Sequence, residues 1–295
     1  DNMDVNKGKV TLSSGNSYVG SLLNGNVYGY SFGIQNKLGR KIRLINQFTA
    51  YSTNSESVES FSFNNFKVSR PYQNKQYQYN LVASYLTDNN IYIGFGYAFF
   101  KTNTDYSYTE YDTISYDWVT NDISTAYSNN LFNVSISKKL KYIQPRLELG
   151  YVDLYDVKQY QIEGDLTYFP LGNNKFYSQT SFAFLSRDES NQQVFTEKIG
   201  VKITDKIWID VSGRFGDLFN YQNANGLVVY NSVGRVKRDL GVFCNFYLKK
   251  LDVSLGYSNQ LRSGAYYNYN YLGEVTTSIY NYNSNNIITA IKWKF

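Results

Sequence analysis

Hydrophobic and polar residues alternate with a period of two along much of this chain. In the segment 91–99, one set of alternate positions holds Ile91, Ile93, Phe95, Tyr97 and Phe99, and the other holds Tyr92, Gly94, Gly96 and Ala98. The same alternation recurs at 132–137, 207–212, 240–248 and 251–258. Because successive side chains of a β-strand point to opposite faces, the pattern predicts amphipathic strands and not helices. One face suits lipid, and the small residues of the other leave room inside a lumen.

Connections between these segments alternate between short and long. Short ones are predicted at 37–40, 87–90, 138–141, 171–174, 204–206 and 249–250, and long polar ones near 53–74, 103–128, 187–192, 217–235 and 262–282. Pairing the segments across them predicts fourteen antiparallel strands, within a range of twelve to sixteen, at about 10–23, 26–37, 41–52, 75–86, 90–102, 129–139, 141–155, 159–169, 175–186, 193–204, 207–217, 236–248, 251–261 and 283–295. An even number of strands places both chain ends at the rim with the short turns.

Composition narrows the fold class further. The 295 residues include 31 Tyr and 19 Phe but only 3 Pro, and the mean hydropathy is −0.44. No stretch approaches the roughly 18 consecutive apolar residues that a membrane-spanning helix requires. Neither the mean hydropathy nor the search for long apolar stretches detects a membrane β-barrel, since only alternate strand residues face lipid. Residues 10–295 are therefore predicted to form one all-β domain, a closed antiparallel transmembrane β-barrel.

A soluble β-sandwich or propeller would show the same alternation, with its apolar face buried. A chain of this size would then need a thick core with many Leu, Ile and Val residues. Here the outward positions near the strand ends hold Tyr, Phe and Trp, as the aromatic girdles of membrane barrels do. The sequence therefore favours the membrane barrel.

The last strand carries a pattern of its own. Phe295 ends the chain, Trp293 stands third from the end, and Ile291 and Ile287 continue the same alternate positions, with Thr289 the one departure. This pattern resembles the C-terminal strand of Gram-negative outer-membrane β-barrels. The resemblance implies that the barrel-assembly machinery recognises Ile291, Trp293 and Phe295. It also implies a location in the bacterial outer membrane after removal of a signal peptide, with short periplasmic turns, longer extracellular loops and residues 1–9 as a periplasmic N-terminal segment.

The absence of histidine restricts the chemistry of the chain. Outer-membrane phospholipases, lipid A deacylases, lipid A palmitoyltransferases and omptin-type proteases all use a histidine near Ser or Asp as the proton shuttle. Glu163 and Asp165 share one face of a strand and could in principle act on glycosides, but they are more simply interpreted as polar lumen lining. No metal-ligand cluster, phosphate-binding loop or nucleophile elbow occurs. We therefore expect no enzyme activity, catalytic residue, metal site or cofactor.

Ten charged side chains are predicted to face the lumen. They are Arg43, Arg146, Glu148, Glu163, Asp165, Lys198, Lys202, Asp210, Arg214 and Asp252. Such charges must be hydrated or paired, so they either line an aqueous pore or form a network that closes it. The net charge is only +5 and the basic residues are scattered, so nucleic acid is not an expected partner.

Two of the long connections are rich in aromatic residues. The segment 105–122 interleaves five acidic residues with five aromatic ones, and 266–282 contains six tyrosines. These segments could bind sugars, or hold Ca²⁺ that bridges lipopolysaccharide phosphates. The simpler interpretation is that the strands continue past the membrane as Tyr-rich hairpins with cross-strand aromatic packing.

Two functions fit these features. One is a passive pore for small hydrophilic solutes, which the polar, Gly-containing lumen positions favour. The other is a non-conducting structural or accessory subunit of a multi-protein outer-membrane complex, which the mixed charges and long loops favour. We favour the pore, because a polar interior is the general property of such barrels. The expected partners are outer-membrane lipid, lipopolysaccharide, the assembly machinery and, for the second function, other envelope proteins.

Overall fold

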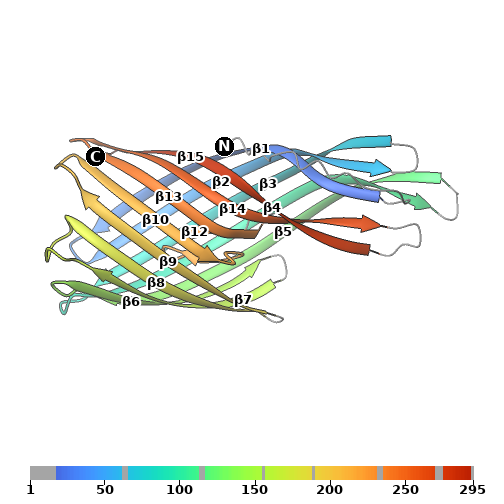
Figure 1. Cartoon of the computed structure of the whole chain (residues 1–295). Helices are drawn as coiled ribbons and strands as arrows, with labels where there is room; N and C mark the ends of the chain where they lie inside the picture. The colour runs from blue at the N-terminus through green and yellow to red at the C-terminus, as the bar shows by residue number, and fades with distance from the viewer. Residues whose placement is uncertain are drawn as a thin grey trace.

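The computed structural model consists mainly of antiparallel β-strands (Figure 1). It describes residues 18–61, 66–112, 117–154, 157–187, 190–230, 235–269 and 275–293. Thirteen long strands form one sheet in which neighbours follow chain order. They are β1 (Tyr18–Leu38), β2 (Ile42–Phe61), β3 (Phe66–Leu86), β4 (Ile91–Asp112), β5 (Asp117–Lys138), β6 (Ile143–Leu154), β7 (Val157–Tyr168), β8 (Phe176–Arg187), β9 (Ser190–Lys202), β10 (Ile207–Gly216), β13 (Arg235–Tyr247), β14 (Leu251–Tyr269) and β15 (Val275–Trp293). Within this described part, no helix is long and apolar enough to cross a membrane.

The two faces of the sheet differ as the alternation predicts. On β6, Leu147 and Leu149 are 44 % and 47 % exposed, whereas Glu148 between them is 1 % exposed. Residues opposite one another in a ladder share a face, and Leu149 lies opposite Val134 and Ile162, which are also exposed. The apolar face is therefore the outer one, which is the reverse of a soluble β-sandwich.

The sheet curls until its last strands return to its first (Figure 1). β14 pairs with β15 along its length, and the residues from Tyr267 to Tyr269 also pair with the first three residues of β1. Toward the other end, Nζ of Lys292 on β15 donates a hydrogen bond to Oε1 of Gln35 on β1 at 3.4 Å. Among the described residues, no ladder joins β1 to β15, which run in the same direction. We call the space inside this curve the lumen.

The start of the chain departs from the predicted fourteen strands. No turn separates the predicted strands 10–23 and 26–37, since β1 is continuous from Tyr18 and contains a β-bulge between Leu23 and Gly25. The ladder with β2 continues on both sides of the bulge, so the strand absorbs the irregularity locally. The prediction of a turn here is wrong.

This continuity changes where β1 begins. Tyr18 pairs with Phe61 at the rim formed by the long hairpins, whereas Leu38 pairs with Ile42 at the short-turn rim. The described chain therefore enters β1 at one rim and leaves β15 at the other, which differs from the prediction that both ends share a rim. Residues 1–17, which include the predicted segment 1–9, lie outside the described residues.

Three of the predicted long loops are mostly strand. The ladder of β2 with β3 reaches Phe61, that of β4 with β5 reaches Asp112, and that of β14 with β15 reaches Tyr269. Strand segments beyond a bilayer need no apolar face, so they lack the alternation from which strands are predicted. In the two Tyr-rich segments, the described residues are paired strands, as the simpler interpretation expects; the cross-strand aromatic packing of that interpretation stays a prediction.

Candidate functional site

The connection between β10 and β13, predicted as a long polar segment near 217–235, folds into the lumen. It contains a short hairpin in which β11 (Gln222–Asn223) pairs with β12 (Val228–Val229). Leu218, Tyr221 and Gln222 are at most 1 % exposed. We call residues 217–230 the lumen hairpin.

The tip of the lumen hairpin is a tight turn that rests against glycines of the sheet. Ala224, Asn225 and Gly226 have φ angles of 55°, 56° and 80°, a left-handed conformation that Asn and Gly adopt more readily than other residues. A Cβ atom on Gly96 of β4 would overlap the carbonyl oxygen of Asn225, and one on Gly150 of β6 would lie 2.6 Å from Oε1 of Gln222. The inward glycines therefore provide room, and the hairpin occupies it.

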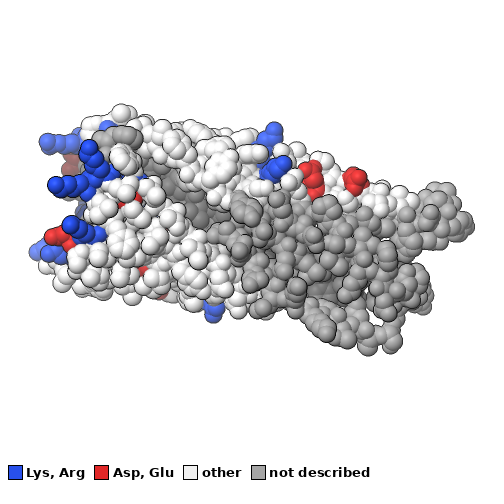
Figure 2. All heavy atoms as spheres, turned by 90° about the horizontal axis from the view of Figure 1, so that it is seen from above, with Lys and Arg blue, Asp and Glu red and all other residues white. Residues whose placement is uncertain are grey.

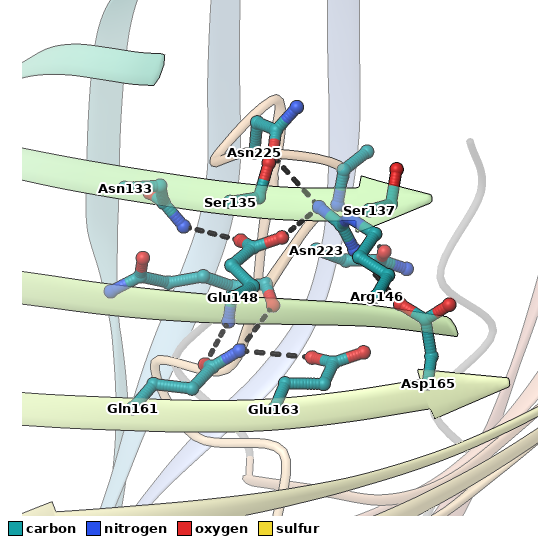
Figure 3. A network of polar contacts seen from close by, with 12 residues as sticks. Asn133, Ser135, Ser137, Arg146, Glu148, Gln161, Glu163, Asp165, Asn223 and Asn225 are labelled. Carbon is teal, nitrogen blue, oxygen red and sulfur yellow. Dashed lines mark hydrogen bonds and ion pairs between the residues drawn. The ribbon is translucent and has the colours of Figure 1, made fainter. Parts of the chain in front are cut away.

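Arg146 of β6 joins the hairpin tip to two carboxylates of the wall (Figure 3). Its guanidinium donates hydrogen bonds to Asp165 at 3.2 Å, to Oδ1 of Asn225 at 2.7 Å and to Glu148. Asn133 of β5 donates to the other oxygen of Glu148 at 2.6 Å. Glu148 is 1 % exposed, so the ion pair with Arg146 compensates a charge that would otherwise be costly to bury.

A second group of contacts attaches the hairpin to β7. The side chain of Gln161 donates to the backbone carbonyl of Gln222 at 2.8 Å and accepts from its N–H at 3.0 Å, as one strand would from another. The hydroxyl of Tyr221 donates to Glu163 at 3.0 Å, and Gln161 donates to the same oxygen at 3.1 Å. Glu163 lies directly opposite Glu148 in the ladder, so these donors stabilise a carboxylate that faces a like charge.

Asp217 holds the base of the hairpin. It accepts hydrogen bonds from the side chain of Gln192 at 2.8 Å and from the backbone N–H of Phe219 at 3.2 Å, and it pairs with Lys237 and Arg235 at 3.3 Å. Burial by itself raises the pKa of this carboxyl, but the Gln192 hydrogen bond, the Lys237 charge and the Phe219 N–H outweigh it, so the pKa lies below its ordinary value. Asp217 is therefore charged and anchored at neutral pH.

Tyr230 ties the returning arm of the hairpin to the wall. Its hydroxyl donates to Asp239 of β13 at 2.5 Å and accepts from Arg214 of β10 at 3.1 Å. Arg214 and Asp239 also form an ion pair at 3.5 Å. Both arms of the hairpin are thus bonded to the sheet.

Apolar side chains pack around the hairpin above these polar contacts. One cluster joins Leu218 and Tyr221 of the hairpin to residues of β8, β9 and β13, namely Ala183, Leu185, Val194 and Val236. Another lies across the lumen on β4, β5 and β6, where Val229 packs against Ala98, Phe100, Leu131, Val152 and Leu154. The hairpin therefore bridges two walls of the lumen.

The remaining side of the lumen is less covered. Ser31, Gly33 and Arg43 lie on the inner face of β1 and β2, as their ladder partners and the hydrogen bond from Gln47 to Ser31 indicate, and all three are exposed. On the hairpin side, Gln161 is only 3 % exposed. The hairpin therefore contacts the wall from β4 to β13 and leaves Ser31, Gly33 and Arg43 open to solvent, whereas Thr49 on the same face of β2 is only 5 % exposed.

The ladders place all ten predicted charged residues on the inner face of the sheet. Four of them, Arg146, Glu148, Glu163 and Asp165, meet beneath the hairpin, and Arg214 contacts its returning arm. The other five lie elsewhere: Arg43 donates to Gln35 at 3.0 Å, Lys198 pairs with Asp210 at 3.6 Å, Lys202 pairs with Asp205 at 2.7 Å, and Asp252 lies opposite Lys292 in the ladder with β15.

No pattern in the sequence predicted the hairpin residues that complete the network. Asn225 is 79 residues from Arg146, and Tyr221 is 58 residues from Glu163. No local pattern encodes such pairs. The available signal was indirect: small inward residues at Gly94 and Gly96 leave a space that some other segment can fill.

The carboxylates of this site are engaged in pairs and hydrogen bonds. Asp165 is bound to Arg146, and Glu163 accepts from Tyr221 and Gln161. In the described ranges, no group of three or more His, Cys, Asp or Glu side chains is placed to hold a metal ion. The geometry therefore joins the hairpin to the wall.

The C-terminal pattern lies on the outer face of β15. Ile287, Ile291 and Trp293 are 75 %, 69 % and 58 % exposed, and Trp293 pairs with Leu251 at the short-turn rim. Phe295 lies outside the described residues.

Comparison with known proteins identifies relatives by fold. No protein-family model matches the chain, and no curated protein matches it. Among solved structures, a FadL homologue from Pseudomonas aeruginosa is similar with a TM-score of 0.53 and 9 % identity, covering 94 % of this chain and 89 % of that one. The toluene transporter TodX from Pseudomonas putida is similar with a TM-score of 0.62 and 8 % identity, covering 96 % and 90 %. The chain has the fold of a Gram-negative outer-membrane β-barrel.

Proposed function

We propose that this protein is a closed outer-membrane barrel that forms a passive pore for small hydrophilic solutes, narrowed by the lumen hairpin. The observation that carries the proposal is the unequal filling of the lumen. The hairpin contacts the wall from β4 to β13, while Ser31, Gly33 and Arg43 on β1 and β2 remain exposed. The lumen hairpin would then be a fixed constriction, with a narrow polar passage between it and strands β1 and β2. Such a passage suits a channel that conducts solutes slowly and selects them by size and charge.

Several features support the membrane placement. The outer face is apolar, the sheet returns from β14 to β1, and the fold matches outer-membrane barrels. In a closed barrel each strand finds partners on both sides, which is the condition for a sheet to cross lipid. We infer an outer-membrane location, with the short turns in the periplasm. No catalytic step is part of the proposal.

Arg43 lies opposite Lys37 in the ladder of β1 with β2, and these two exposed charges on the inner face should set ion preference in this passage. We expect discrete conductance steps in planar bilayers and a smaller preference for anions in Arg43→Gln. The matched control is Lys101→Gln, which removes the same charge from the outer face of β4. Lys101 and Phe99 are two residues apart and therefore lie on the same face of the strand. If both variants conduct like the parent protein, solutes do not pass beside β1 and β2.

The second candidate is a non-conducting barrel that serves as a subunit of an envelope complex. The number of bonds that hold the hairpin favours it, because a firmly fixed loop can close a lumen permanently. A silent bilayer together with stoichiometric co-purification of other envelope proteins would support this function and refute the pore.

TodX is described as a toluene transporter, which raises the question of apolar solutes. The apolar clusters in this lumen pack against the hairpin's own Leu218, Tyr221 and Val229. The exposed inner positions Ser31, Gly33, Lys37 and Arg43 are polar or small, whereas Tyr51, farther along the same face of β2, is 43 % exposed. These contacts favour hydrophilic solutes as the substrate class.

A further inference from the structure

The short-turn rim carries a ring of exposed basic side chains. Figure 2 shows Lys and Arg gathered at this end of the molecule. The short turns and adjoining strand ends hold ten of them: Lys37, Arg40, Lys41, Lys138, Lys139, Lys141, Lys175, Lys206, Lys249 and Lys250. Two acidic residues, Asp88 and Asp205, lie in these turns, and each pairs with one Lys, at 2.6 and 2.7 Å. The rim therefore keeps a large positive excess.

Exposed apolar residues stand between these cations. Leu38, Leu140, Leu171, Ile203 and Leu248 are 55 %, 43 %, 61 %, 55 % and 48 % exposed. Each belongs to a different turn and is within four residues of a Lys. Apolar and cationic side chains thus alternate around the same rim of the barrel. Such a mixture is typical of a protein surface at the boundary between acyl chains and lipid headgroups.

Aromatic rings hold some of these lysines at that level. Nζ of Lys139 lies 5.5 Å from the ring centre of Phe169, and Nζ of Lys141 lies 4.9 Å from that of Tyr142. Lys139 also donates to Asn174 of the next short turn at 3.1 Å. The ammonium groups are thus positioned at the rim and still exposed.

We propose that this ring binds the phosphate headgroups of anionic phospholipids in the leaflet on the short-turn side. The cations occur in five of the six short turns, so they surround the rim, as a leaflet does, and do not form the single sector that a protein partner would cover. Negative membrane surfaces attract clusters of Lys and Arg in this position. The inference rests on the proposed transmembrane placement and adds the lipid chemistry that one leaflet supplies.

The test compares the folded protein in phosphatidylcholine vesicles with and without about a quarter of phosphatidylglycerol. Folding in pure phosphatidylcholine, read by heat-modifiable migration in gels, tests membrane insertion separately. If insertion fails in every vesicle, the transmembrane placement is wrong. If it succeeds, the urea midpoint of unfolding tests the ring, and phosphatidylglycerol should raise that midpoint.

Two matched triple variants locate the effect. Replacing Lys139, Lys141 and Lys249 by Gln should remove about a third of the phosphatidylglycerol shift, since these are three of the ten rim cations and each attracts the anionic surface separately. Replacing Lys75, Lys101 and Lys158 by Gln, away from the short turns, should leave the shift intact. The proposal is overturned if phosphatidylglycerol has no effect, or if both triples lose it equally.

Two soluble probes distinguish other anions. Inorganic phosphate or poly-glutamate is added at matched ionic strength to the protein in phosphatidylcholine. Neither should reproduce the shift. If phosphate does so, the ring binds a free ion, and if poly-glutamate alone does so, it binds an acidic protein. Either result overturns the lipid assignment.

Discussion

The contact between Gly96 and the hairpin tip gives the sharpest test of the lumen hairpin as a constriction. A Cβ at Gly96 would overlap the carbonyl oxygen of Asn225 and lie 3.0 Å from its carbonyl carbon. Since unstrained carbon contacts are about 3.5–4.0 Å, Gly96→Ala should displace the tip by about 1 Å. Strand β4 itself tolerates Ala, so the hairpin is the part that moves.

The energetic consequence follows from the two hydrogen bonds that Oδ1 of Asn225 accepts. Arg146 donates at 2.7 Å and Ser135 at 2.9 Å, and a displacement of about 1 Å takes both beyond hydrogen-bonding range. One bond is charge-assisted and the other neutral, so their loss weakens docking by about 2–4 kcal/mol. The ratio of docked to undocked hairpin should fall by about 30- to 1,000-fold.

Single-channel recording in planar bilayers measures this ratio as the fraction of time spent in a higher-conductance state. We expect that fraction to rise in Gly96→Ala and to stay at the parent value in Gly33→Ala. Gly33 also faces the lumen, but the nearest atom to its added Cβ is 3.4 Å away. Replacing residues 219–229 by a short Gly-Ser linker should give the higher conductance permanently. If Gly96→Ala conducts like the parent protein, the hairpin is not the constriction. The same conclusion follows if Gly96→Ala still changes the conductance of the linker variant, in which the hairpin is absent.

Three further predictions concern anchoring, stability and assembly. Asp217→Asn should weaken the hairpin base by about 1–2 kcal/mol at neutral pH. Because the pKa of Asp217 is lower in the folded protein than in the unfolded chain, the parent protein keeps this anchor above about pH 3.9 and loses it as the pH falls toward the folded pKa. Single-channel recordings at a series of pH values would detect this loss. Arg146→Met should lower the free energy of unfolding, measured in urea, by about 3–5 kcal/mol, because it leaves the buried carboxylate of Glu148 without its partner. Adding Glu148→Gln removes that charge and should restore part of the lost stability. Deleting Phe295 should lower the folded amount in the outer membrane far more than deleting residues 1–7; equal yields on fractionation would contradict the assembly role.

The sequence by itself determined the faces of the sheet. Alternation at 91–99 and elsewhere depends only on the two-residue period of a strand, so it assigns Phe95 outward and Gly96 inward without any knowledge of neighbours. The inner position of charged residues such as Arg146 and Asp252 followed from the same period. Ladders then align these faces, because opposite residues share a side.

Only the tertiary structure decided strand continuity at the N-terminal end and the path of the lumen hairpin. The bulge between Leu23 and Gly25 remains strand because β2 pairs on both sides of it, and this long-range pairing cannot be read from residues 10–37 alone. The sequence of the lumen hairpin lacks the regular alternation of hydrophobic and polar residues from which strands are predicted. Its position depends on partners up to 90 residues away, as in the hydrogen bond from Ser135 to Asn225. Contacts of that range depend on the curl of the whole sheet, so no local pattern predicts that residues 217–230 fold into the lumen.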